Sequence, residues 1–273
     1  MLNPARKRVA SEMEVEPEPS DDEYIPSDEY AGASGHGSQT FVLRTKINAA
    51  IRPYRGATPR QTFAHTFEDH PLRYSNHTTG MTRMVRYDNP DEILIYISGQ
   101  KVVKSETDKH AGCAVVYETE HRSFAPNPLV FSLEETGLDG AKQSRTTYCA
   151  TLRAIVAALE LKTWASEGWK QVTIATDSIA IHHEVTVNLA KWVAKGWLKG
   201  RSVHRPPHPE LWSRAFDLIN EQAYHGCEVG FLLITEKQNQ HAVYLASMIA
   251  CSDLVSEEYQ ACGEVGFTFR EAL

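Results

Sequence analysis

The sequence predicts an α/β domain, because strand-like and helix-like segments alternate after an initial group of strands. Three apolar, strand-like segments lie between residues 91 and 133, and two more begin at Val172 and Val229. Segments between and after these later strands carry apolar side chains at helical spacing. The predicted order is three strands, a helix, a strand, a helix, an insert, a helix, a strand and a helix. This order places the chain in the α/β class.

The strand predictions start with Ile93–Ile97, a continuous apolar run that we expect to be a buried strand ending in a turn at Ser98–Gly99. Gly112–Thr119 is the second predicted strand, and Phe124–Leu133 contains a third. Only the short link Glu118–Arg122 separates these two, which predicts a hairpin. Two later segments are also predicted strands: Val172–Asp177 and Val229–Ile234.

The helix predictions rest on apolar spacing and on capping residues. Thr146 or Thr147 is a suitable N-cap for a helix that ends before Gly168. The segment Gly196–Pro209 is rich in Gly, Pro and bases, so we expect an insert there. Three further helices are predicted around and after it: Ile179–Ala194, Glu210–Ala223 and Asn239–Cys251.

Composition divides the chain into four parts. The 273 residues carry a net charge of −7, and 42% are apolar, which is enough to bury a sizeable core. Nine acids and three bases lie in residues 1–40, so we expect an acidic, disordered tail. Residues 41–90 are treated as an N-terminal extension, 91–252 as the folded domain and 253–273 as a C-terminal tail.

The sequence excludes a membrane-spanning helix, since no run of about 18 apolar residues occurs. The N-terminus has no apolar core of a secretory signal. Five cysteines lack a Cys-x-x-Cys pair, which favours reduced thiols and an intracellular location, nuclear or cytoplasmic. We expect no membrane partner, and the acidic tail is either a solvated segment or a binding segment for a basic protein partner.

Seven motifs follow one another from the first predicted strand to the last predicted helix: IYISGQ (95–100), AGCAVVY (111–117), QSRTTYCATLRAIVAALE (143–160), VTIATDS (172–178), KWVAKGW (191–197), PELW (209–212) and ITEKQNQHAVYLAS (234–247). In this order they make the residues from about 91 to 250 resemble the type 1 ribonuclease H domain, and the last motif has the short-loop form of fungal members. The resemblance implies a ribonuclease H-like fold, with a mixed five-stranded sheet flanked by helices.

The resemblance implies an altered catalytic site. The family cleaves the RNA strand of an RNA–DNA hybrid, and four carboxylates hold two Mg²⁺ ions that activate water. The four matching positions here are Ser98, Thr151, Asp177 and Val243, so only Asp177 keeps its carboxylate. Because Mg²⁺ prefers anionic oxygen ligands, we expect no cofactor and a catalytically inactive pseudoenzyme.

Other readings of this site stay open at the sequence level. If the chain is an active enzyme, Mg²⁺ is its cofactor and Glu236 is the best substitute ligand beside Asp177. Glu106 and Asp108, in the first hairpin, are further substitutes. Alternatively, the Asp177 carboxylate caps the helix that follows at Ser178.

The family's substrate-contact positions also carry altered residues. Thr147, Tyr148 and His208 stand at these positions, although Tyr148 also has the apolar spacing of a core residue. Bases interleaved with tryptophans are typical of a surface that binds a phosphate backbone, and the alternative is a solvated helix face with tryptophans in the core. This set consists of Lys191, Trp192, Lys195, Trp197, Lys199, Arg201 and Arg205.

Three functional hypotheses follow from these residues. The first is a ribonuclease H-like protein that binds RNA–DNA hybrid or duplex and has lost catalysis. The second is an active, metal-dependent hybrid ribonuclease with an atypical site. The third is a protein-interaction module that has lost nucleic-acid binding, since a fold alone does not carry an activity.

Overall fold

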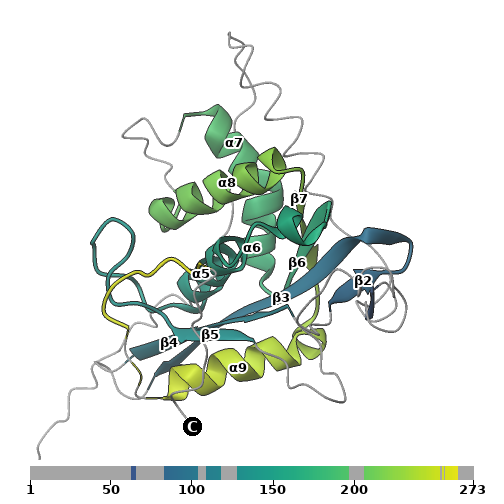
Figure 1. Cartoon of the computed structure of the whole chain (residues 1–273). Helices are drawn as coiled ribbons and strands as arrows, with labels where there is room; N and C mark the ends of the chain where they lie inside the picture. The colour runs from purple at the N-terminus through teal and green to yellow at the C-terminus, as the bar shows by residue number, and fades with distance from the viewer. Residues whose placement is uncertain are drawn as a thin grey trace, which may run out of the picture.

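The computed structural model describes residues 63–65, 83–103, 109–117, 128–196, 206–252, 254 and 256–263. The acidic tail and most of the N-terminal extension lie outside these residues. Figure 1 shows a sheet with helix α9 on one face and helices α5, α6 and α8 on the other. This arrangement confirms the predicted α/β class.

A mixed sheet forms the centre of the fold, and its main strands follow the order β5-β4-β3-β6-β7. The strands β5, β4 and β3 pair antiparallel, whereas β3, β6 and β7 pair parallel. Two short strands of the extension add to this set, because β2 pairs with β3 and β1 pairs with β2. Within the described residues, these two strands and the five expected ones form a seven-stranded sheet: β1 (Phe63–His65), β2 (Met84–Arg86), β3 (Asn89–Val103), β4 (Lys109–Val116), β5 (Leu129–Ser132), β6 (Gln171–Thr176) and β7 (Glu228–Leu233).

The expected turn at Ser98–Gly99 is wrong, because β3 continues through it. Ser98 pairs with Ala114 of β4, and Gly99 pairs with Cys113. Gly99 instead allows helix α5 to pack closely against β3, since a Cβ atom there would lie 2.1 Å from the backbone nitrogen of Thr151 in α5. The prediction failed because a glycine in a strand can mark close packing by another element rather than a turn.

The third strand, β5, is shorter than expected and starts only after Pro128. Proline has no N–H to donate to a strand ladder, so it is suited to the residue before the strand. β5 pairs antiparallel with β4, as the hairpin prediction requires, and the link Glu118–Arg122 lies outside the described residues.

The helices begin close to the predicted residues, but α5 ends at Glu160, and Gly168 ends the separate 3₁₀ helix η1 instead. Thr146 caps α5, because its hydroxyl accepts a hydrogen bond from the backbone N–H of Cys149 at 3.1 Å. The predicted helix Ile179–Ala194 contains a π-helical turn, η2, between α6 and α7. No described helix is long and apolar enough to span a membrane. The helices are α5 (Thr147–Glu160), η1 (Trp164–Glu167), α6 (Ile179–His183), η2 (Glu184–Asn188), α7 (Leu189–Ala194), α8 (Pro209–Tyr224), η3 (Glu236–Gln238) and α9 (Gln240–Cys251).

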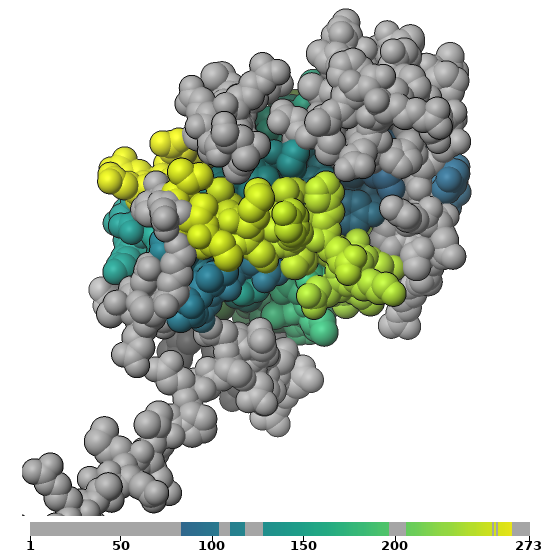
Figure 2. All heavy atoms as spheres, turned by 90° about the horizontal axis from the view of Figure 1, so that it is seen from below, coloured from purple at the N-terminus to yellow at the C-terminus, as the bar shows by residue number. Residues whose placement is uncertain are grey.

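The two faces of the sheet are packed differently. The main core lies between the sheet and helices α5 and α8, and it includes three fully buried tryptophans: Trp164, Trp169 and Trp212. On the opposite face α9 lies close to the sheet, as the view from below in Figure 2 shows. Gly112 permits this approach, since a Cβ atom there would lie 2.2 Å from Cγ2 of Ile249.

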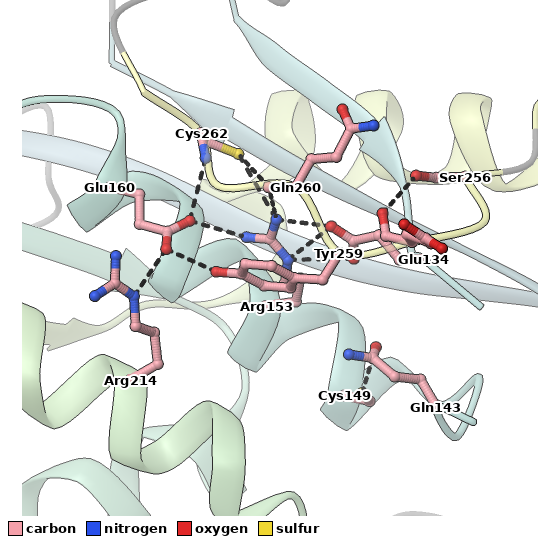
Figure 3. A network of polar contacts seen from close by, with 11 residues as sticks. Glu134, Gln143, Cys149, Arg153, Glu160, Arg214, Ser256, Tyr259, Gln260 and Cys262 are labelled. Atoms are coloured by element: carbon pink, nitrogen blue, oxygen red, sulfur yellow. Dashed lines mark hydrogen bonds and ion pairs between the residues drawn. The ribbon is translucent and has the colours of Figure 1, made fainter. Parts of the chain in front are cut away.

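The segment that we call the C-terminal strap, residues 256–262, packs against the domain (Figure 3). Glu135 donates its backbone N–H to the carbonyl of Ser256 at 2.9 Å. The guanidinium of Arg153 donates to the carbonyl of Gln260 at 2.7 Å, and the Tyr259 hydroxyl donates to Glu160 at 2.7 Å. The described part of the expected C-terminal tail therefore belongs to the folded domain.

Candidate functional site

The structure brings four positions together near the C-terminal end of β6. Ser98 lies on β3, next to the glycine against which Thr151 of α5 packs. Asp177 directly follows β6. Asn239 connects β3 with the end of β6, since its Nδ2 donates to the Ile97 carbonyl at 2.9 Å and to Oδ1 of Asp177 at 2.7 Å.

Val243 completes the set from the first turn of α9. Its backbone N–H donates to the carbonyl of Asn239 at 3.0 Å, so Val243 lies one helical turn after the residue that holds Asp177. We call Ser98, Thr151, Asp177 and Val243 the four-position site.

Internal hydrogen bonds occupy the two hydroxyl groups of the four-position site. The Thr151 hydroxyl donates to the carbonyl of Thr147, one turn earlier in α5, at 2.9 Å. The Ser98 hydroxyl accepts a hydrogen bond from the Gln100 side chain at 3.3 Å. Both side chains are buried, with 1% exposure at Ser98 and 2% at Thr151. These hydroxyls serve local structure.

Asp177 is half-buried and does not cap the following helix, so that alternative reading is wrong. Ser178 is the N-cap of α6, and its hydroxyl accepts from the backbone N–H of Ile181 at 3.3 Å. The Asp177 carboxylate instead accepts from the Asn239 amide. With its Nδ2 engaged in this way, Asn239 keeps a buried Oδ1 that has no hydrogen-bond partner among the described residues.

The residues of the four-position site do not fit a pair of Mg²⁺ ions. Two ions bring four positive charges, and Asp177 is the one carboxylate among the four side chains. Val243 has no ligand atom. Within the described residues, no group of three or more His, Cys, Asp or Glu side chains is placed to hold a metal.

Of the three acids considered as substitute Mg²⁺ ligands, the structure describes one. Glu236 is exposed and lies in the 3₁₀ turn η3, three residues before Asn239. Glu106 and Asp108 lie outside the described residues.

A chain of aromatic contacts links α7, α8 and α5 beside this site. Trp192 of α7 packs edge-on against Trp212 of α8, with ring centroids 5.6 Å apart. Trp212 donates its indole N–H to the Tyr148 hydroxyl at 3.0 Å, and Tyr148 stacks on His208 at 6.1 Å. Tyr148 and His208, which the resemblance places at substrate contacts, therefore lie together, and both are only half-buried.

His208 adopts an unusual backbone conformation at this point. Its φ is 55° and its ψ is 56°, and it is the described non-glycine residue with positive φ. Such conformations cost about 1–3 kcal/mol and concentrate at functional sites. Pro209 follows at the start of α8 and fixes the entry of the chain into that helix.

The Cys149 thiol beside His208 is not an activated nucleophile. Its sulfur lies 3.6 Å from Nδ1 of His208 and 3.6 Å from Oε1 of Gln143. Burial, followed by the nearby Glu210 carboxylate, raises the pKa of Cys149 to about 12. A nucleophilic cysteine requires a lowered pKa, so this pair does not support thiol catalysis.

The basic residues are described in part. Lys191 and Lys195 are exposed on α7 and at its end, and Trp192 between them is half-buried. Thr147 is half-buried at the start of α5. The remaining members of the set lie outside the described residues: Trp197, Lys199, Arg201 and Arg205.

Sequence reasoning missed two parts of this region. From the sequence, Asn239 is only the start of a predicted helix, and its signal is an asparagine where that helix begins. Arg153 was also missed. It is the single charged residue in the apolar segment Leu152–Leu159, a pattern that indicates a buried charge with a partner. It lies fully buried between the rings of Phe131 and Tyr259, with Glu134 as its carboxylate partner.

Comparisons with known proteins give solved structures alone: no family model and no curated protein matches the chain. The crystal structure of LC9-RNase H1, "a type 1 RNase H with the type 2 active-site motif", matches with 20% identity and a TM-score of 0.42, covering 58% of this chain and 72% of that one. The solution structure of the prototype foamy virus RNase H domain matches with 15% identity and a TM-score of 0.42, covering 57% and 93%.

A foamy viral protease-reverse transcriptase in complex with RNA/DNA hybrid matches with 18% identity and a TM-score of 0.43. The match covers 58% of this chain and 20% of that one, so the chain spans about a fifth of the viral protein. With TM-scores below 0.5, these similarities establish neither family membership nor an activity for this chain.

Proposed function

We propose that this chain is a ribonuclease H-like protein that binds RNA–DNA hybrid or duplex nucleic acid and does not cleave it. One observation carries the proposal: the four positions that would hold two metal ions lie together, but three of them bear Ser98, Thr151 and Val243. A protein with this arrangement lacks the ligands for two-metal hydrolysis.

The nearby surface favours binding over a purely structural role. Lys191 and Lys195 are exposed on the same short helix that contributes Trp192 to the aromatic chain. Positive charge beside aromatic rings suits a phosphate backbone with accessible bases or sugars. In the absence of metal ions, four carboxylates would repel a phosphate backbone. Since Ser98, Thr151 and Val243 carry no charge, most of this repulsion is absent here.

Equilibrium binding to a labelled RNA–DNA hybrid tests the proposal. Adding EDTA should not reduce the affinity, because no bound ion mediates the contact. It should fall steeply with salt, with a log–log slope of about −3 to −4.5 if three to five phosphates are engaged. The double variant Lys191→Ala, Lys195→Ala should flatten this slope by about 1 to 2.

Lys170→Ala is the matched control. Lys170 is 74% exposed and lies beside the first residue of β6, at the strand end opposite Asp177. Its removal should leave the salt slope unchanged. No binding to hybrid or duplex at low salt would refute the proposal and favour the protein-interaction alternative.

A further inference from the structure

A second apolar cluster lies on the sheet face opposite the main core. Along β3 its member Leu94 alternates with Ile93 and Ile95 of the main core, so the two sets point to opposite faces. The Tyr96 side chain packs against this cluster. We call its five buried residues the second cluster: Met84 of β2, Leu94 of β3, Ala175 of β6, Leu232 of β7 and Ile234, which follows β7.

Helix α9 lies on the same face as the second cluster but farther along β3. Asn239, just before α9, donates to the carbonyl of Ile97, and the end of the helix packs on Gly112, which pairs with Gln100. The helix therefore covers β3 from Ile97 onwards, after Leu94. Among the described helices, those that pack on β6 and β7 are α6 and α8, and they lie on the other face (Figure 1).

The side chains of the second cluster are nevertheless buried. Leu94 is 1% exposed, Ala175 0% and Leu232 3%. On an open sheet face these side chains would be in contact with water. Because the structure contains one chain, the atoms that cover them belong to a part of this chain outside the described residues.

The connection between β1 and β2 is the segment best placed to cover the second cluster. The two strands pair antiparallel with His65 opposite Met84, so the chain leaves and re-enters the sheet at one point. A hairpin there needs about two to five residues, whereas this connection takes residues 66–83. Met84 itself belongs to the second cluster and pairs with Leu94, so both ends of the connection lie beside the cluster.

The sequence of residues 66–82 suits an apolar contact. Four large apolar side chains lie along it: Phe67, Leu72, Tyr74 and Met81. The link between β4 and β5, residues 118–127, has Phe124 as its one large apolar residue. Residues 41–62 enter β1 at Phe63, which pairs with Arg86 rather than with Met84.

We propose that residues 66–82 pack on the second cluster and complete the domain on the face beside α9. Apolar side chains of this segment, buried against Leu94, Ala175 and Leu232, supply the contacts that hold it. The folded domain then includes the connection between β1 and β2 and begins before residue 91.

Thiol protection in the full chain tests this proposal. Ala175→Cys places a small thiol in the second cluster, and Cys251→Ser removes the exposed native thiol. In this parent, reaction of the introduced thiol with a maleimide, located by mass spectrometry, should be slow. Adding Phe67→Ser and Leu72→Ser should raise its rate about tenfold or more, because local opening controls access to a buried group.

Matched changes elsewhere in the chain serve as controls. Phe41→Ser with Leu43→Ser makes the same two replacements outside residues 66–82, and Phe124→Ser tests the link between β4 and β5. Both controls should leave the introduced thiol protected. Loss of protection in either control would overturn the assignment to residues 66–82, as would a thiol that reacts rapidly in the parent or stays protected when Phe67→Ser and Leu72→Ser are present.

The native thiol of Cys113, buried in the main core, separates local exposure from general unfolding. It should stay protected in every variant. If Cys113 also reacts in the double variant, the single changes Phe67→Ser and Leu72→Ser take its place, and unchanged protection of the introduced thiol in both would overturn the proposal. Because no nucleic acid is present, these outcomes are independent of the proposed binding function.

Discussion

Single hydroxyl groups show how the four-position site departs from a metal centre. The Thr151 hydroxyl turns back to its own helix, and the Ser98 hydroxyl accepts from a residue two positions along its own strand. Each side chain is therefore satisfied within its own element and offers no charge to a cation. Asp177 alone retains a carboxylate, and Asn239 holds it.

Rebuilding the carboxylates tests whether these residues share one site. The triple variant Ser98→Asp, Thr151→Glu, Val243→Asp places three new acids around Asp177. We expect measurable Mg²⁺ binding by calorimetry where the parent shows none, with weak hybrid cleavage at most, because two-metal chemistry tolerates little misplacement. Adding Asp177→Asn to the triple variant should reduce the Mg²⁺ binding.

Stability decides how that result is interpreted. Ser98 and Thr151 are almost fully buried, so an unpaired carboxylate there costs several kcal/mol and raises its own pKa. Urea unfolding of each single variant should come first. A triple variant that stays folded and binds no Mg²⁺ would contradict our assignment of the four positions.

Glu167 gives the fold a defined acid sensitivity. Its carboxylate accepts from Arg83 at 2.9 Å, from Lys162 at 2.7 Å and from the Trp169 indole at 3.0 Å. Burial opposes ionisation, but Arg83 and then Lys162 outweigh it and lower the pKa of Glu167 from 4.5 to about 2. A lowered pKa stabilises the folded state above pH 4.5, and this stability is lost as the pH falls towards 2.

We expect Glu167→Gln to remove this pH dependence. The parent chain should lose about 3 kcal/mol of unfolding free energy between pH 4.5 and 2 through this group, from 1.36 kcal/mol per pKa unit. The variant should be less stable at pH 7 and should show a shallower decline with acid. Urea unfolding across this pH range measures both effects, and equal slopes in the two proteins would refute the assignment.

At the level of elements, α5 connects the site to the C-terminal strap. Its first two turns carry Tyr148 and Thr151, and Arg153 and Glu160, which follow in the same helix, hold the strap (Figure 3). Burial alone would lower the pKa of Arg153, but Glu134, Tyr259 and Cys262 raise it above its ordinary value. The arginine therefore stays charged and depends on its partners.

Removal of the strap should destabilise the domain. A chain that ends at Ser252 loses the Gln260 carbonyl from Arg153 and the Tyr259 hydroxyl from Glu160. Breaking buried charged contacts costs about 3–5 kcal/mol, so thermal unfolding should occur at a much lower temperature or without cooperativity. A chain that ends at Gly263 keeps the strap and should unfold like the parent. Equal stability of the two truncated chains would contradict this role.

Local patterns explain which elements the sequence predicts well. Apolar spacing is a property of neighbouring residues, so the order of strands and helices and the Thr146 cap follow from it. The continuation of β3 through Gly99 depends on α5 crossing the strand, and the strap depends on Arg153 meeting Gln260, 107 residues away. Such contacts leave no periodic signal in the sequence.

The candidate site shows the same division. The motifs identify Ser98, Thr151, Asp177 and Val243, which lie on four different elements that the fold brings together. The bridging role of Asn239 could not be read in the same way, since it requires a strand carbonyl 142 residues away. The aromatic chain from Trp192 to His208 likewise joins three elements that only tertiary packing makes adjacent.

For the whole molecule, the proposed function is binding of nucleic acid without hydrolysis. The chain is acidic overall, yet the helix beside the aromatic chain exposes Lys191 and Lys195. The four-position site contributes one carboxylate where two-metal catalysis calls for several. The central claim is therefore that this chain contacts nucleic acid at a site that cannot organise two metal ions.

Incubation of the purified chain with an end-labelled RNA–DNA hybrid in Mg²⁺ or Mn²⁺ tests this claim most directly. Denaturing gels should show no RNA cleavage above the buffer control, while the same preparation retains hybrid in a binding assay with EDTA. Asp177→Asn should change neither result. Metal-dependent cleavage by the parent chain that disappears in Asp177→Asn would contradict the account and establish an active ribonuclease.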